Sequence, residues 1–377
     1  MRSVYYNDSL DTYFLTRFAD CQAVLVDPDF LVPDLDWCAR EVPAWREHPA
    51  AGLFYSSMLR RNGSEHERLR RLVGRGFSAR RAAALRTSVE GVTDTLLDRF
   101  ADATADGGAA DFQELVGYPL PVAVMGELIG VSPEDHERFH GLGRDASRLL
   151  EPVRTPEDWG RADEAVAALR EYFTALVDRR RSRPADDLTS TLLAVRDAGD
   201  GRLTERELVD TLVLVLVAGF ETTASLLGLA VFALLSHPGQ LALVQERPEL
   251  VPAAVEEVLR WDTPVQMTER IAARDVKVGG VTIPEGGNVT TVLAAANRDP
   301  DQHTDPDTFS VLRRDSKVLS FSAGPHYCLG AALARMEGAV LVGRIFSRFR
   351  KLAPAGPPVR RASISLRSFD YLPLVTT

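Results

Sequence analysis

One of the three cysteines, Cys328, lies between a glycine-containing loop and an amphipathic helical pattern. The segment is FSAGPHYCLGAALARMEGAVLVGRIF, which spans 321–346. A sulfur at a helix N-terminus is favoured as a thiolate, because the helix dipole and the free backbone N–H groups stabilise negative charge. Gly324 and Gly330 allow the backbone to fold closely around that sulfur. The pattern therefore indicates a cysteine that binds a metal as an anion.

A carboxyl group and a hydroxyl group are adjacent in AGFETT, which spans 218–223 within a long apolar stretch. Glu221 and Thr222 offer an acid and a hydroxyl side by side, which could form a proton relay. Gly219 would allow a local opening of the helix beside them. The alternative is that Thr222 bonds to a carbonyl of its own helix and that Glu221 is a buried structural carboxyl group.

Two pairs of charged residues share a helix face by their spacing. His66 and Arg70 lie four residues apart in SEHERLRR, and Glu257 and Arg260 lie three residues apart in AVEEVLRW. At these spacings the side chains are neighbours on a helix. The Glu257–Arg260 pair alone also fits a solvated surface, where such pairs are common. A basic surface of the helix suits Arg68, Arg71 and Arg75 in and after the other segment.

The segment around Cys328 is similar to the haem-binding loop of the cytochrome P-450 family, whose pattern is F-G-x-G-x-H/R-x-C-x-G. The residues that match are Phe321, Gly324, His326, Cys328 and Gly330. Ser322 stands where the family usually has glycine. The resemblance implies haem b as the cofactor and Cys328 as the ligand of its iron.

AGFETT resembles the oxygen-activation motif of the same family, A-G-x-D/E-T-T. This resemblance implies that Glu221 and Thr222 are catalytic and deliver protons. It also implies that Ala218 and Gly219 contact the haem.

Further segments match the family in order and spacing, and the resemblance runs from about Leu10 to the C-terminus. Glu257 and Arg260 match its E-x-x-R pair, and Arg313 matches the third member of the same structural network. The residues that the resemblance assigns to the haem propionates are His66, Arg70, Arg270 and His326.

The implied fold is mainly α with a minor β part, with the haem between the long central helix and the helix that follows Cys328. Thiolate ligation favours O–O cleavage over reversible O2 carriage. The resemblance thus implies a haem-thiolate monooxygenase that inserts one oxygen atom from O2 into a small organic substrate, by hydroxylation or epoxidation. Ferredoxin and a ferredoxin reductase would supply the electrons, because the chain has no room for a flavin or nucleotide-binding domain.

By analogy with the family, the substrate pocket is mostly apolar. This predicts a hydrophobic, medium-sized substrate such as a secondary-metabolite intermediate. The residues expected to line the pocket are Phe54, Tyr55, Met58, Leu214, Phe220, Val265, Gln266, Met267, Phe369 and Tyr371.

Three other functions stay open at this point. A haem electron carrier or another non-catalytic haem protein would need Cys328 but not Glu221 and Thr222. A peroxide-driven haem peroxygenase would let an acid group of its substrate do the work of those two residues. A membrane protein could be built on the apolar stretch 212–235, which is long enough to span a bilayer.

The composition is that of a globular protein, with 45% hydrophobic and 26% charged residues among 377. A net charge of −9 does not favour nucleic acid or an anionic membrane as a partner. The three cysteines form neither a disulfide framework nor a zinc site, so Cys21 and Cys38 are interpreted as small buried apolar residues. The start of the chain lacks the pattern of a secretory signal, and a cytoplasmic location is expected.

The elements that must position these residues are mainly helical, from about Ser64 to Phe349. Thr204 and Glu207 form a capping-box pattern at the start of the central helix, and His237-Pro238-Gly239 ends it. A charged Glu221 in the middle of 212–235 would cost roughly 2.5–3.5 kcal/mol in a bilayer. A buried core helix is therefore favoured over a membrane span.

Strand patterns are few and lie in three regions: TYFLTR at 12–17, VKVGGVTI at 276–283 and ISLRSF at 364–369. In the second, Gly279-Gly280 predicts a two-residue hairpin turn. The minor β part is expected to be confined to these regions. No repeat, low-complexity tract or linker separates two cores, so residues 1–377 are predicted to form a single haem domain.

Overall fold

The computed structural model describes residues 3–42, 44–77, 79–152, 154–197, 203–314 and 317–376. The chain divides into two compact units, each assembled from segments that are far apart in the sequence. The first unit contains Met1–Val32, Thr93–Leu115 and Ser225–Thr377, and the second contains Pro33–Val92 and Val116–Ala224. The single domain expected from the sequence stays a prediction.

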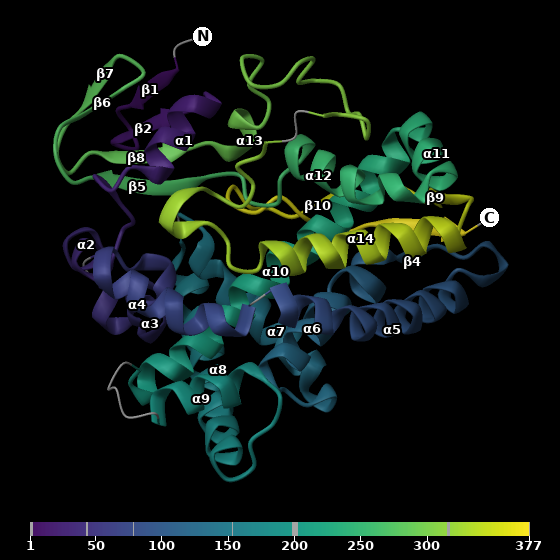
Figure 1. Ribbon diagram of the computed structural model, residues 1–377, viewed down its shortest axis with the longest axis horizontal. Helices are drawn as coiled ribbons and strands as arrows, with labels where there is room; N and C mark the ends of the chain where they lie inside the picture. Colours follow the sequence, from purple (N-terminus) through teal and green to yellow (C-terminus); the bar gives the residue numbers. More distant parts are fainter. Residues whose placement is uncertain are drawn as a thin grey trace. The chain divides into compact units, whose positions relative to one another are not determined.

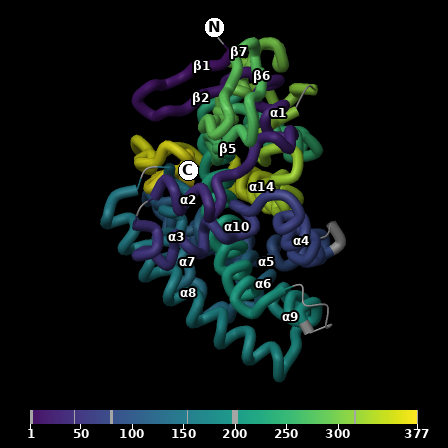
Figure 2. The backbone as a smooth tube through the Cα atoms, turned by 90° about the vertical axis from the view of Figure 1, so that its left-hand side faces the viewer, coloured from purple at the N-terminus to yellow at the C-terminus, as the bar shows by residue number. Residues whose placement is uncertain are grey.

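The strands that the structure describes all belong to the first unit, and the largest sheet has five of them. They are β1 (Val4–Asn7), β2 (Thr12–Leu15), β3 (Phe30–Leu31), β5 (Thr268–Ala272) and β8 (Asn288–Thr291). Their order is β1-β2-β8-β5-β3, with β2 parallel to β8 and every other pair antiparallel. Helix α1 (Phe18–Val26) lies beside this sheet in Figure 2 and shares an apolar core with it.

Smaller sheets complete the β part of the first unit. A hairpin joins β6 (Val276–Val278) to β7 (Val281–Ile283), and Gly279 and Gly280 both have positive φ, 53° and 83°. Two consecutive positive φ values are what a type I′ turn requires, so this prediction is confirmed. The remaining strands are β4 (Ala110–Asp111), β9 (Leu352–Pro354), β10 (Val359–Arg360), β11 (Phe369–Tyr371) and β12 (Pro373–Thr376).

Four further helices of the first unit are α11 (Pro238–Glu246), α12 (Val251–Trp261), α13 (Leu293–Ala296) and α14 (Ala331–Arg348). Proline in the first turn of α11 and of α12 starts each helix without losing a hydrogen bond. Helices α12 and α14 pack closely, because Gly338 of α14 leaves room for the side chain of Val255. This packing fixes α14 against α12, and with α14 the cysteine loop that precedes it.

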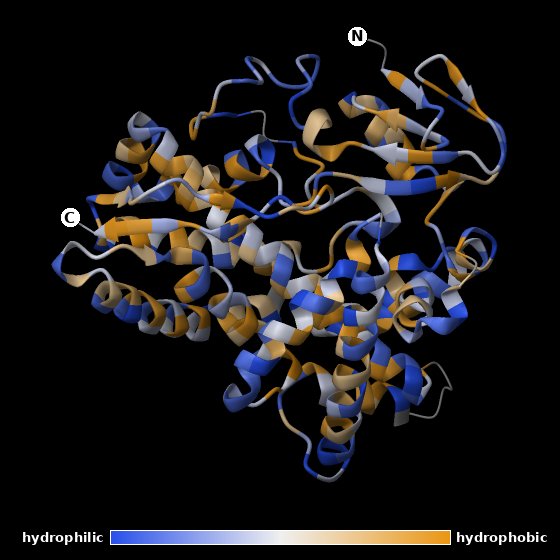
Figure 3. Ribbon diagram, turned by 180° about the vertical axis from the view of Figure 1, so that it is seen from behind, coloured by the Kyte–Doolittle hydropathy of each residue, from blue (hydrophilic) through white to orange (hydrophobic). Residues whose placement is uncertain are grey.

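The second unit is helical in its described part. Its helices are α2 (Leu35–Glu41), α3 (Pro49–Ser56), α4 (Gly63–Gly74), α6 (Pro119–Ile129), α7 (His136–Ala146), α8 (Pro156–Ser182) and α9 (Leu188–Asp197), drawn in Figure 1. Figure 3 shows hydrophilic and hydrophobic residues side by side along most helices, as helices with one buried face require. Two longer helices, α5 (Ala79–Ala103) and α10 (Glu205–Ser236), contribute residues to both units.

Helix α10 is the long central helix that the sequence predicts. The Thr204 hydroxyl accepts from the Glu207 N–H at 3.1 Å, and the Glu207 carboxylate accepts from the Thr204 N–H at 2.8 Å, which confirms the capping box. The helix ends at Ser236, directly before His237-Pro238. Within the described chain it is the one helix long and apolar enough to cross a membrane, yet 83% of its most apolar 18-residue window is buried. That burial is what a core helix shows.

The sequence-based boundaries were wrong in three places. Helices begin well before Ser64, with α1, α2 and α3, because these helices are too short to show a clear period. The β part is not confined to three regions, since β5, β8 and β9 lie outside them. Of ISLRSF, only Phe369 lies in a strand, β11, and Leu366 forms an isolated bridge with Val265 before it; β12 follows β11 toward the C-terminus.

Candidate active site

The loop before α14 presents Cys328 at the surface of the first unit. The Cys328 N–H donates to the Phe321 carbonyl at 2.9 Å, which closes the loop on itself. Ser322 and Gly324 have positive φ, 61° and 67°, and a Cβ on Gly324 would lie 2.6 Å from the Leu25 carbonyl oxygen. Residue 324 must therefore be glycine for two reasons: its φ is positive, and a side chain would clash with the Leu25 carbonyl. Ser322 adopts the left-handed conformation in which the family usually has glycine.

Cys328 differs from the other two cysteines in its accessibility. Cys328 is exposed, whereas Cys21 and Cys38 are fully buried. Burial raises the pKa of Cys21 to about 12 and that of Cys38 to about 11, so both stay neutral thiols at physiological pH. This agrees with the prediction that Cys21 and Cys38 are small buried residues.

The donor set at Cys328 fits a haem iron. In the described ranges, no group of three or more His, Cys, Asp or Glu side chains could hold a metal ion. A porphyrin supplies the other ligands of its iron, so a haem would need only one thiolate from the chain here. The exposed thiol on a closed loop suits that role.

Arg335 of α14 clamps the same loop, and sequence reasoning missed it. Its Nη1 donates to the Tyr327 hydroxyl at 3.1 Å, and its Cζ lies 4.4 Å from the centroid of the Phe321 ring. Glu256 of α12 holds the guanidinium with both carboxylate oxygens. This pairing raises the pKa of Arg335. The side chain thus touches residues at both ends of the Phe321–Cys328 loop.

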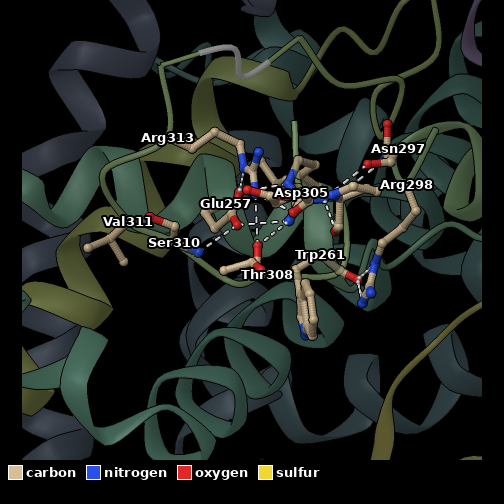
Figure 4. Close-up of polar contacts among 12 residues, drawn as sticks. Glu257, Trp261, Asn297, Arg298, Asp305, Thr308, Ser310, Val311 and Arg313 are labelled. Carbon is tan, nitrogen blue, oxygen red and sulfur yellow. Dashed lines mark hydrogen bonds and ion pairs between the residues drawn. The ribbon is translucent and has the colours of Figure 1, made fainter. Parts of the chain in front are cut away.

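The structure joins Glu257, Arg260 and Arg313 in a buried network, of which Figure 4 labels Glu257 and Arg313. The Glu257 carboxylate accepts from Arg260 at 2.7 and 2.8 Å and from Arg313 at 3.1 Å, and also from the Ser310 N–H at 2.8 Å. Arg260 and Glu257 are 0% and 1% exposed, so the surface alternative for this pair is wrong. Arg260 and Arg313 also donate hydrogen bonds to backbone carbonyls of 297–308.

The AGFETT residues lie on an unbroken part of α10, so the predicted opening at Gly219 is not present. Gly219 instead leaves room for Met125, because a Cβ there would lie 2.7 Å from the Met125 Cε. The Thr222 hydroxyl donates to the Ala218 carbonyl at 2.9 Å. Glu221 is fully buried. The hydroxyl of Thr222 therefore has the helix bond that the alternative interpretation describes, and its oxygen can still accept a hydrogen bond.

A narrow apolar cavity lies in the second unit, against the α10 face that also carries Thr222. Leu214, Ala218 and Thr222 follow one another at four-residue spacing and so share that face. The lining residues are Leu53, Phe54, Leu149, Leu150, Val166, Val213, Leu214, Val217 and Ala218. All of them are apolar, so the cavity offers no charged group of its own.

Of the pocket residues expected from the sequence, only Phe54 and Leu214 line this cavity. Phe220 lies elsewhere, because its ring fills the space beside Gly143 and lies near His140. Tyr55 is buried beside Phe54, and Met58 is part of the turn that follows α3. The rest belong to the first unit: Val265, Gln266 and Met267 before β5, the buried Phe369, and Tyr371, which is exposed on β11.

The residues that the resemblance assigns to the propionates lie in both units. In the second unit, His66 is buried and Arg70 half-buried on α4. In the first unit, Arg270 on β5 is buried, and its Nη1 donates to the Glu269 carbonyl at 2.7 Å. His326 is half-buried in the cysteine loop. His66 is thus not part of an exposed basic face, whereas Arg71 and Arg75 are exposed.

Comparison with known proteins gives consistent matches over nearly the whole chain. Residues 39–363 match the family described as cytochrome P-450. The chain is 38% identical over 376 residues to 6-deoxyerythronolide B hydroxylase of Saccharopolyspora erythraea, covering 97% of this chain and 90% of that protein. It is 40% identical over 375 residues to nocardicin C N-oxygenase of Nocardia uniformis, covering 97% and 89%. The crystal structure of CalO2 is similar with a TM-score of 0.91 at 31% identity, covering 100% of this chain and 93% of that chain.

Proposed function

Because the chain belongs to the cytochrome P-450 family, it is a haem b monooxygenase, and we propose that Cys328 is the residue that binds the haem iron. The observation that carries this assignment is the exposed thiol on a loop that the Phe321 carbonyl closes. The haem supplies the centre at which O2 is reduced and one oxygen atom is inserted into the substrate. The relatives named as a hydroxylase and an N-oxygenase do not support a peroxygenase or a non-catalytic haem protein.

The chain's own contribution at Cys328 is to hold a thiolate. The loop's closure through the Phe321 carbonyl fixes the backbone at the sulfur. The N-terminus of α14 begins three residues later and favours the anion. Arg335, in the second turn of α14, holds the loop in place through Tyr327 and Phe321. His66, Arg70, Arg270 and His326 would bind the propionates.

Glu221 and Thr222 are proposed to deliver the protons that oxygen activation consumes. For Thr222 to pass a proton, its hydroxyl must turn away from the Ala218 carbonyl, and a bond of this neutral kind contributes only about 0.5–1.5 kcal/mol. That cost is small against a catalytic barrier, so the helix bond does not exclude the role. Glu221 is a carboxyl group on the adjacent position of α10, which could replace the proton that the hydroxyl gives up.

The substrate is proposed to be a hydrophobic, medium-sized compound, such as a secondary-metabolite intermediate. The apolar lining of the cavity against α10 supports this proposal. So do the relatives whose names give 6-deoxyerythronolide B and nocardicin C as what they oxidise. Hydroxylation and epoxidation both fit these observations.

A redox partner supplies the electrons, and we propose a ferredoxin with its reductase, with the enzyme in the cytoplasm. The candidate docking residues are arginines of α4 and the turn after it. Arg68 is already paired with Glu65 and Glu207, so Arg71 and Arg75, which are exposed, are the better candidates. Reduction by ferredoxin should slow at high ionic strength and on charge reversal at Arg71 and Arg75. A rate that ignores both changes would exclude this docking site.

The ligand assignment is tested by the spectrum of the reduced, CO-bound protein. The native protein should show the strongly red-shifted Soret band of thiolate-ligated haem, and Cys328→Ala should lose it. Cys21→Ala and Cys38→Ala are matched controls, because both thiols are buried and neutral, and both variants should keep the band. A Cys328→Ala protein that retains the band would show that the iron ligand is another residue.

A further inference from the structure

The apolar cavity of the second unit is too small for the substrate proposed above. Its volume is about 10 Å³, which is about the room that one water molecule needs. Sites that bind small organic molecules usually have volumes of roughly 300–1,000 Å³. A wall of the cavity must therefore move before a medium-sized compound can occupy it.

Helix α3 is the wall element that can move with the least loss of structure. It has 8 residues, whereas α8 and α10 have 27 and 32. A helix as short as α3 is not stable alone in water, so its neighbours must hold it in place. Ala50, Leu53 and Phe54 share one face of α3 by their spacing, and Leu53 and Phe54 line the cavity. A contact that holds Ala50 in place therefore also holds the cavity wall.

Asp163 of α8 holds the first turn of α3. Its Oδ1 accepts from the Ala50 N–H at 2.9 Å, and its Oδ2 lies 2.7 Å from Nδ1 of His48, which is the donor because a carboxylate can only accept. His48 is the N-cap of α3, yet its side chain makes no cap bond, so the carboxylate of α8 takes that role. A negative charge is favoured at a helix N-terminus, which makes this contact stronger than one between neutral groups.

The contact is made by one face of α8 and is open to water. Trp159 precedes Asp163 by four residues, and its ring stacks on the His48 ring with centroids 4.8 Å apart and planes at 16°. The side chains of His48 and Asp163 are 24% and 21% exposed. Water can therefore take the place of the partners when α3 moves away, so the contact can open and close.

We propose that Asp163 is a latch that holds α3 against α8 in the free enzyme and releases α3 when the substrate enters. This inference rests on the proposed function, because it assigns the apolar cavity to part of the substrate. In the substrate-bound enzyme, Leu53 and Phe54 lie farther from α8, and the cavity is wider. The enzyme must break the latch in order to bind, so the latch lowers the affinity for the substrate.

Removing the latch should tighten binding, which is the reverse of what the loss of a merely structural contact does. Asp163→Ala should bind decanol about tenfold more tightly than the native protein, because the variant has no bonds to Ala50 and His48 to break. Tenfold corresponds to about 1.4 kcal/mol. Association should be faster by the same factor, and dissociation should be unchanged. Calorimetric titration and stopped-flow mixing of the haem-loaded proteins measure the affinity and the rates.

Two further variants locate the effect. Asp163→Asn should have an intermediate affinity, because the amide oxygen can still accept from the Ala50 N–H. Glu157→Ala is the matched control, because Glu157 also lies on α8 but is paired with Arg161 of the same helix, and it should stay within twofold of the native protein. If Asp163→Ala binds decanol no more tightly than the native protein does, or if neither protein binds it, the proposal is overturned.

Hydrogen exchange of the native haem-loaded protein tests the latch without any substitution. Saturating decanol should speed exchange of the Ala50 amide, because its acceptor Asp163 is released, and should leave the amides in the middle of α8 unchanged. Slower or unchanged exchange at Ala50 would show that α3 stays on α8, and the latch would then be wrong. Loss of the thiolate band would contradict the proposed function, whereas exchange at Ala50 would still support or overturn the latch.

Discussion

Replacing Glu257 by Gln should destabilise the first unit far more than the same change at its neighbour Glu256. Glutamine keeps the shape of the side chain but removes the charge that faces Arg260 and Arg313. Arg260 is 0% exposed, so its guanidinium cannot be compensated by water. Removing one partner of a buried ion pair typically costs about 3–5 kcal/mol, because the other charge stays buried.

Glu256→Gln is the matched control on the same helix. The Glu256–Arg335 pair is 26% and 33% exposed, and exposed pairs contribute about 1 kcal/mol or less. The two variants should therefore differ by about 2–4 kcal/mol in the free energy of unfolding. With a urea slope of about 3 kcal/mol per M, the unfolding midpoint of Glu257→Gln should lie about 1 M below that of Glu256→Gln.

The assay is urea unfolding of each haem-loaded variant, followed by far-UV circular dichroism at low and high salt. Salt screens the exposed pair but not the buried network, so only the effect of Glu256→Gln should shrink at high salt. Equal midpoints for the two variants would refute the reasoning. So would a Glu257→Gln effect that salt abolishes, because the network would then not be buried in solution.

Variants at three other positions, with their controls, test separate parts of the protein. Thr222→Ala should consume electrons at a near-normal rate but release more hydrogen peroxide and less product, whereas Thr222→Ser should stay coupled; unchanged coupling in Thr222→Ala would leave Thr222 a packing residue. Burial raises the pKa of Glu337 on α14 to about 8, so the folded state holds its proton more tightly than the unfolded state and the native protein loses stability as pH rises from about 4.5 to about 8. The melting temperature should drop less from pH 6 to pH 8.5 in Glu337→Gln than in the native protein. Equal drops in the two proteins would contradict the raised pKa of Glu337. Arg335→Gln should hasten loss of the red-shifted CO band in mild urea, because the clamp on Phe321 and Tyr327 is removed, while Arg348→Gln at the far end of α14 should not.

Local sequence patterns predicted those parts of the fold that local interactions determine. The long central helix was visible because its capping box and its apolar run are contiguous, and the β6–β7 hairpin because two glycines select its turn. The central sheet was not visible. Strand β2 pairs with β8, from opposite ends of the chain, and the register Thr12 to Asn288 leaves no mark in either segment. Polar positions in β5 and β8 also hide their strand character.

At the site, too, residues related by local spacing could be predicted from the sequence, and contacts between distant segments could not. Glu257 and Arg260 could be paired from their spacing, and the loop pattern predicts Cys328 as the haem ligand. Phe220 was misplaced because the cavity face of α10 carries Val213, Leu214, Val217 and Ala218, and the ring of Phe220 lies beside Gly143 and His140 instead. Arg335 was missed because it resembles any arginine on an amphipathic helix, although its position seven residues after Cys328 could have suggested a contact with the loop.

Two successive glutamates of α12 explain how one helix supports both sides of the cysteine loop. Neighbours on a helix point about 100° apart, so Glu256 and Glu257 face different partners. Glu257 holds Arg260 and Arg313, which in turn bind the backbone carbonyls of 297–308, ahead of the loop. Glu256 holds Arg335 on α14, after the loop. The segments before and after the cysteine loop are therefore both bonded to α12. A shift of α12 would move both ends of the loop together. The hydrogen bond that closes the loop at Cys328 would then stay unchanged.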